Sequence, residues 1–75
     1  METVVRSVGF SLPEREQEYE LNICLGGTTE VLATRLIPAG TTSVTVELSG
    51  TGTMEFDLYI DGVFECSQPA RFTDD

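Results

Sequence analysis

The chain has 75 residues, with 13 Asp and Glu against 4 Arg and no Lys or His, which gives a formal net charge of −9. This length allows one domain with a small core, and 40% hydrophobic residues are too many for a disordered chain. Without His or Lys there is no imidazole nucleophile system, His metal ligand, Schiff-base lysine or P-loop lysine. We therefore predict a protein that is not an enzyme, with no catalytic residue, no bound metal and no cofactor.

Charge and hydropathy also exclude some classes of binding partner. Nucleic-acid binding needs clustered basic residues, and here scattered arginines are outnumbered by acids, so no direct contact with nucleic acid is expected. No apolar run reaches the roughly 18 residues that span a bilayer, and the first ten residues lack the pattern of a secretion signal. We expect no membrane partner.

Alternation of apolar and polar residues, with closely spaced turn residues, predicts strands along the whole chain. Residues 13–18 begin with proline and contain helix formers, but they are too few for a stable helix, so a solvated loop is expected. Gly26-Gly27 and Asp61-Gly62 fit two-residue hairpin turns, in which both residues take positive φ. The six predicted strands lie near residues 3–12, 18–25, 28–37, 42–49, 53–60 and 63–72.

Six short strands with one dry face each predict an all-β fold: one antiparallel sandwich of two three-stranded sheets, or a small barrel. A shift of 35 residues lays 20–30 on 55–65, with Gly27 on Gly62 and Ile23 on Leu58. The chain can therefore be drawn as two pseudo-repeats, near 3–37 and 42–72. Any two alternating hairpins can align in this way, so both interpretations stay open.

The two cysteines are expected on opposite faces. Cys24 alternates with Glu20 and Asn22 and should point outward, whereas Cys66 shares a face with Phe64 and should point inward. Sulfur atoms on opposite faces do not meet without a bulge. Two separate thiols are the preferred interpretation, with a disulfide as the alternative.

Acidic side chains fall on the outward positions of several strands. They form a predicted acidic face made of Glu20, Glu47, Glu55 and Asp57. Such a face keeps a small β-protein soluble and protects its sheet edges, or it imitates the charge of a nucleic-acid backbone. Calcium is disfavoured, because Asp57 and Asp61 alone do not make a binding loop.

The third predicted strand carries apolar side chains on both faces. Val31, Ala33 and Ile37 share one face, and Leu32 and Leu36 share the other. A strand with two apolar faces lies between layers or against another protein, although such side chains can also cover the open ends of a sandwich. The candidate protein interface consists of Val5, Leu32, Leu36 and Val63.

The run from Pro38 to Val63 (PAGTTSVTVELSGTGTMEFDLYIDGV) resembles the Thr/Val/Gly-rich hairpins of small immunoglobulin-like modules on phage virions and bacterial surface proteins. It covers about a third of the chain. The resemblance implies an accessory or decoration protein that docks on a larger shell or tail, and it carries over no functional residue. The departure from the family is length, since such modules usually have more residues and more strands.

Three functions follow from these observations. The leading one is a phage virion component, assembled in the host cytoplasm, whose partners are further copies of itself or a capsid or tail lattice. The second is an acidic mimic of nucleic acid that inhibits a host defence nuclease. The third is an adhesion or carbohydrate-binding module, which is weakened by the lack of Trp, with Tyr19 and Tyr59 as the only tyrosines.

Overall fold

The computed structural model describes residues 3–72 and confirms the all-β prediction, with every predicted strand present. The predicted loop over residues 13–18 is also confirmed. The strands are β1 (Val4–Ser11), β2 (Tyr19–Leu25), β3 (Val31–Ile37), β4 (Ser43–Gly50), β5 (Thr53–Ile60) and β6 (Val63–Arg71).

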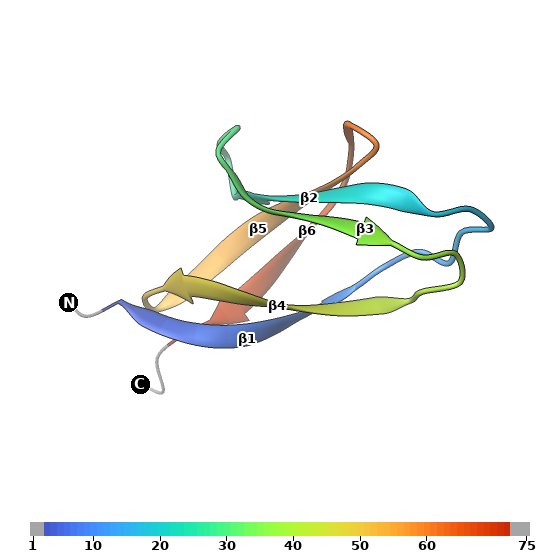
Figure 1. Cartoon of the computed structure of the whole chain (residues 1–75). Coiled ribbons are helices and arrows are strands. Elements are labelled where there is room, and N and C mark those ends of the chain that lie inside the picture. The colour runs from blue at the N-terminus through green and yellow to red at the C-terminus, as the bar shows by residue number, and fades with distance from the viewer. Residues whose placement is uncertain (1–2, 73–75) are drawn as a thin grey trace.

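The strands form two stacked sheets of unequal size (Figure 1). β1 pairs with β4 in a two-stranded sheet, and the other sheet has the order β3-β2-β5-β6, with all pairs antiparallel. The prediction of two three-stranded sheets is therefore wrong. The β2–β3 and β5–β6 hairpins each stay within one layer, and β2 and β5 pair side by side, so four strands collect in one sheet.

The core fills the space between the sheets with the inward side chains of both. Its centre is a cluster of three phenylalanine rings. The ring centroid of Phe56 lies 5.9 Å from that of Phe10 and 6.0 Å from that of Phe72, and both contacts are edge-to-face. This geometry sets the positive ring edge against the negative ring face and adds to the effect of burial. The other buried core residues are Val8, Leu12, Tyr19, Leu21, Ile23, Ile37, Val46, Leu48, Leu58 and Ile60.

The two hairpins turn differently. Asp61 (φ 49°) and Gly62 (φ 83°) both take positive φ between the paired residues Ile60 and Val63, so this predicted two-residue turn is confirmed. The same prediction for Gly26-Gly27 is wrong. β2 ends at Leu25 and β3 begins at Val31, and only the second glycine has positive φ (76°).

Each hairpin contains one β-bulge, at matching places. The ladder shifts between Ile23 and Cys24 in the β2–β3 pair and between Leu58 and Tyr59 in the β5–β6 pair, and these positions are 35 residues apart. The extra residues are Leu32 in β3 and Glu65 in β6. A bulge reverses the facing of every residue on one side of it, which the alternation pattern alone does not reveal.

The strands related by the 35-residue shift lie in equivalent places. Ile23, which the shift lays on Leu58, is also the residue that pairs with Leu58. β1 pairs with β4, β2 pairs with β5, and β3 and β6 are the two edges of the larger sheet. The pattern of strand pairing is thus unchanged when β1, β2 and β3 are exchanged with β4, β5 and β6.

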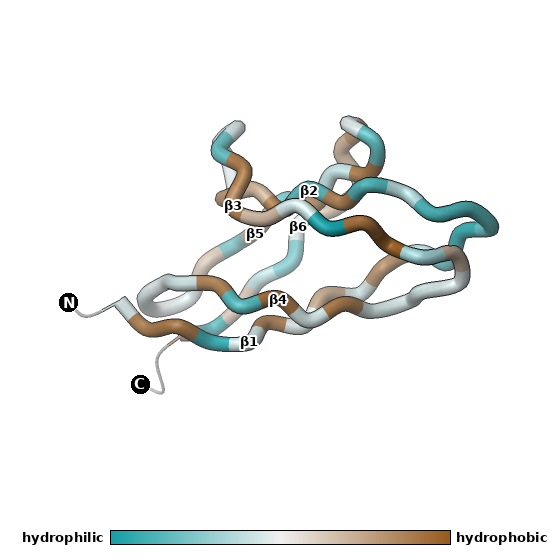
Figure 2. Tube along the Cα trace, viewed as in Figure 1, coloured by the Kyte–Doolittle hydropathy of each residue, from teal (hydrophilic) through white to brown (hydrophobic). Residues whose placement is uncertain are grey.

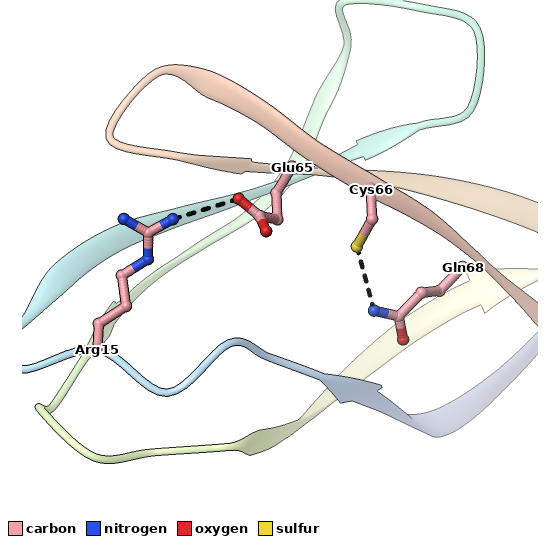
Figure 3. A network of polar contacts seen from close by, with 4 residues as sticks. All are labelled: Arg15, Glu65, Cys66 and Gln68. Carbon is pink, nitrogen blue, oxygen red and sulfur yellow. Dashed lines mark hydrogen bonds and ion pairs between the residues drawn. The ribbon is translucent and has the colours of Figure 1, made fainter.

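The loop between β1 and β2 is held through Arg15. Its guanidinium donates to the Glu65 carboxylate at 3.3 Å (Figure 3) and lies 5.8 Å from the ring centroid of Tyr19, while its carbonyl accepts a bond from the Gly40 N–H at 2.9 Å. Burial is the main cause that raises the pKa of Tyr19, the Arg15 cation opposes the shift, and Glu65 adds to it. The Tyr19 hydroxyl is buried without a hydrogen-bond partner.

Candidate interaction surface

The outer face of the four-stranded sheet is hollowed between its two hairpin ends. Both ends rise from the sheet on the side away from β1 and β4 (Figure 1). Between them lies a groove of about 220 Å³, which we call the hairpin groove. It is lined by Asn22, Cys24, Thr29, Val31, Tyr59 and Gly62.

We call Val31, which lines the hairpin groove, and Phe64, which packs on the lining residue Tyr59, the two rims of the groove. Val31 on one hairpin and Phe64 on the other are each 52% exposed, and the first residues of β3 and β6 are brown in the hydropathy view (Figure 2). The Phe64 ring packs edge-to-face on Tyr59 at 5.6 Å between centroids. Both rims therefore present ordered apolar side chains to solvent, one from each half of the chain.

The floor of the groove holds a buried thiol. Cys24 lies on the outer face, as predicted, but it is only 4% exposed because Val31 and Asp57 flank it on the neighbouring strands. Burial, and after it the Asp57 carboxylate, raises the pKa of the Cys24 thiol. The thiol is therefore neutral at physiological pH and is not an activated nucleophile.

The Asp57 carboxylate links the structural elements that surround the groove. One carboxylate oxygen accepts a bond from the Ser67 hydroxyl at 2.6 Å, and the other accepts from the Gly27 N–H at 3.1 Å. The side chain thus ties β5 both to β6 and to the turn between β2 and β3. Gly26 adds a main-chain tie, since its N–H donates to the Glu55 carbonyl at 2.8 Å.

The two cysteines are separate free thiols, in agreement with the preferred interpretation. Cys66 points inward and packs against the core, as predicted. Phe64 does not share its face, however, because the bulged Glu65 lies between them and turns Phe64 outward. The same effect in β3 places Val31 on the outer face with Leu36, whereas Ala33 and Ile37 face inward.

The structure distributes the predicted interface residues over several surfaces. Val5 is exposed on the outer face of the β1–β4 sheet, and Leu36 is exposed on the outer face of the other sheet. Leu32 is the extra residue of the β3 bulge, and Val63 follows the β5–β6 turn. The four residues are all exposed, but Val5 lies across the sandwich from the others.

The predicted acidic residues are also divided. Glu20, Glu55 and Asp57 lie on the outer face of the four-stranded sheet, whereas Glu47 lies on the outer face of the two-stranded sheet. The carboxylate of Asp57 is already engaged by two donors.

Other sites in the described part of the chain offer less chemistry. Within residues 3–72 no three His, Cys, Asp or Glu side chains gather as metal ligands do, and no helix is present that could cross a membrane. A shallow hollow of about 520 Å³ lies along the β1–β2 loop, lined by that loop alone. The hairpin groove brings side chains from both halves of the chain together around a buried thiol.

No protein-family model matches the chain, and no curated protein or solved structure shows significant similarity to it.

Sequence reasoning missed the residues that form the rims. Tyr59 and Phe64 lie in strands whose apolar and polar residues alternate up to the bulge, and the bulge turns Phe64 to the same face as Tyr59. The available signal lay in the hairpin around Asp61-Gly62, where an unbroken ladder from the turn would set Glu65 opposite the core residue Leu58.

Proposed function

We propose that the chain is a non-enzymatic structural protein that associates with other copies of itself through the apolar outer face around the hairpin groove. The observation that carries this proposal is the matched exposure of Val31 and Phe64 on two hairpins that Asp57 holds in place. Exposed aromatic and aliphatic side chains on a rigid scaffold are typical of the centre of protein interfaces.

Several features favour assembly over a role as a free monomer. A chain of 75 residues buries only about 60% of the surface that its unfolded form exposes, so apolar surface covered by a neighbour adds directly to stability. The groove lies between the ends of the two hairpins, with one rim from each half. A neighbouring copy can therefore meet the two rims with its own two rims in a symmetric contact.

The narrower proposal is that this assembly is part of a phage virion, as a decoration or head or tail accessory protein. It is supported by the resemblance of residues 38–63 to virion modules and by the small β-sandwich fold. The nucleic-acid mimic and the adhesion module remain the alternatives. The placement of the acidic residues on both sheets does not favour the mimic.

Charged substitutions at the rims test the proposal. We expect wild-type protein to form a reversible oligomer in sedimentation equilibrium, and the double variant Val31→Asp/Phe64→Asp to stay a folded monomer, because the contact would bury unpaired carboxylates. Val5→Asp is the matched control, since Val5 is 62% exposed on the opposite sheet. Unaltered oligomers of the double variant, or a wild-type monomer at all concentrations, would contradict self-association through this face.

A further inference from the structure

The two-stranded sheet has an open edge along β1, next to β6. In the part of the chain that the structure describes, β1 pairs with β4 and with no other strand. A groove of about 260 Å³ lies along this edge, between residues 6–9 of β1 and residues 69–71 of β6. It is separate from the hairpin groove, which lies on the outer face of the other sheet.

The side chain of Gln68 shows which main-chain groups of β1 face this edge. The Ser11 N–H donates to the Gln68 side-chain oxygen at 3.0 Å, and the Gln68 amide nitrogen donates to the Ser11 carbonyl at 2.7 Å. On the other side, the Leu12 N–H donates to the Thr42 carbonyl at 2.9 Å. Because main-chain groups alternate between neighbours along an antiparallel strand, those of Val5, Ser7 and Gly9 point the same way as those of Ser11.

Gln68 therefore makes the hydrogen bonds that the first residue of an adjacent strand would make. Its amide offers one donor and one acceptor, as a strand residue does, and it occupies the position beside Ser11. The next positions along the edge, Gly9 and Ser7, line the groove, and Val5 follows them in the same alternation. Main-chain groups in such a row are a template for a further strand.

The facing layer indicates that a strand is missing from this position. Two strands cannot cover four, and the inward side chains of β6 remain only half-buried: Cys66, Gln68 and Ala70. Figure 3 shows Cys66 and Gln68 on β6, joined by a contact of 3.4 Å between the amide nitrogen and the sulfur. A strand added beside β1 would lie under these side chains and complete their burial.

From this geometry we infer that the open edge of β1 binds an extended segment of a partner polypeptide, about five residues long, as an added antiparallel strand. Its main chain pairs with Gly9, Ser7 and Val5, and its side chains are short, because they fill a narrow groove that Ala70 and the two arginines Arg6 and Arg71 line. The segment must be a lone strand. β1 of a second copy would bring its own β6 into the space that β6 already occupies.

Amide hydrogen exchange measured by NMR tests this inference on the full chain. In the free protein, Ser7 and Gly9 should exchange fast although they lie in mid-strand, whereas Val8 and Phe10, bonded to β4, should exchange slowly. The probe is an acetylated, amidated hexapeptide of alternating Thr and Ala. At about ten times its Kd it should slow exchange at Ser7 and Gly9 about tenfold.

Two proline variants form a matched pair. Gly9 and Thr45 are directly opposite each other, and their N–H groups face the two opposite edges of the sheet. Proline at such a position removes an edge donor and leaves the ladder intact. Gly9→Pro should abolish the protection by the peptide, and Thr45→Pro should retain it.

Three results would overturn the inference. One is slow exchange at Ser7 and Gly9 in free monomeric protein, and another is a dimer in which these amides become protected without peptide. The third is a peptide that leaves their exchange unchanged or protects Tyr59 and Val31 instead. The exchange pattern of the wild-type protein decides the matter even where a proline variant fails to fold.

Discussion

The hydroxyl of Tyr19 is a polar atom buried without a partner at the centre of the contacts that hold the first loop. Its ring packs in the core and beneath Arg15, so the aromatic body contributes packing while the hydroxyl contributes a desolvation cost. The neutral form is favoured in the folded state, because burial raises the pKa of Tyr19 above its ordinary value of 10.0. The contribution to stability is therefore present below pH 10 and is lost as pH rises through the folded pKa.

We expect Tyr19→Phe to raise the free energy of unfolding at neutral pH by about 1 kcal/mol, since the ring remains and the unpaired hydroxyl is removed. The variant should also lose less stability than wild type above pH 10. Chemical denaturation at pH 7 and pH 11 measures both effects. Tyr59→Phe, on the half-buried outer face, is the control; a Tyr19→Phe variant less stable than wild type would show that its hydroxyl has a partner.

Gly26 is required by close approach. A Cβ atom on this residue would lie 2.7 Å from the main-chain oxygen of Glu55, and a backbone atom cannot move aside as a side chain can. We expect Gly26→Ala to destabilise the fold by about 1–3 kcal/mol and to lift the β2–β3 hairpin from β5. Gly9→Ala is the control, because nothing lies within 4 Å of its Cβ position. Equal stability of the two variants in thermal unfolding would contradict this account.

At the scale of elements, strand number and order along the chain could be predicted because each strand shows alternation and each is bounded by turn residues. The distribution of strands between sheets could not, since it depends on which hairpins pair side by side. The residues at the rims of the hairpin groove could not be predicted from the sequence either. The bulges at Leu32 and Glu65 reverse the facing of Val31 and Phe64, and a period-2 pattern read from one end of the strand carries no trace of that reversal.

Gln68 joins the two sheets through the oxygen and the nitrogen of its side-chain amide. We expect Gln68→Ala to lower the free energy of unfolding by about 1–3 kcal/mol, since two hydrogen bonds to Ser11 are lost. The Ser11 amide should then exchange as fast as Ser7 and Gly9. Gln17→Ala, in the exposed loop, is the control for loss of a glutamine. A Ser11 amide that stays protected in Gln68→Ala would show that another group covers this position.

At the scale of the whole molecule, the described strands build one small core and leave an apolar groove between the two hairpin ends. The net charge of −9 opposes association between copies at low salt, because like charges on both copies repel. The apolar contact itself is insensitive to screening. Salt should therefore strengthen self-association, whereas an acidic mimic of nucleic acid would bind its basic partner less tightly as salt rises.

The native mass measured by light scattering, over a range of protein concentrations at about 0.05 M and about 1 M salt, tests self-association most directly, since the Debye length falls from above 10 Å to about 3 Å. We expect the mass to rise with protein concentration at both salt levels, and to rise further at high salt. A mass of 8.2 kDa at every concentration and in both salts would contradict the account.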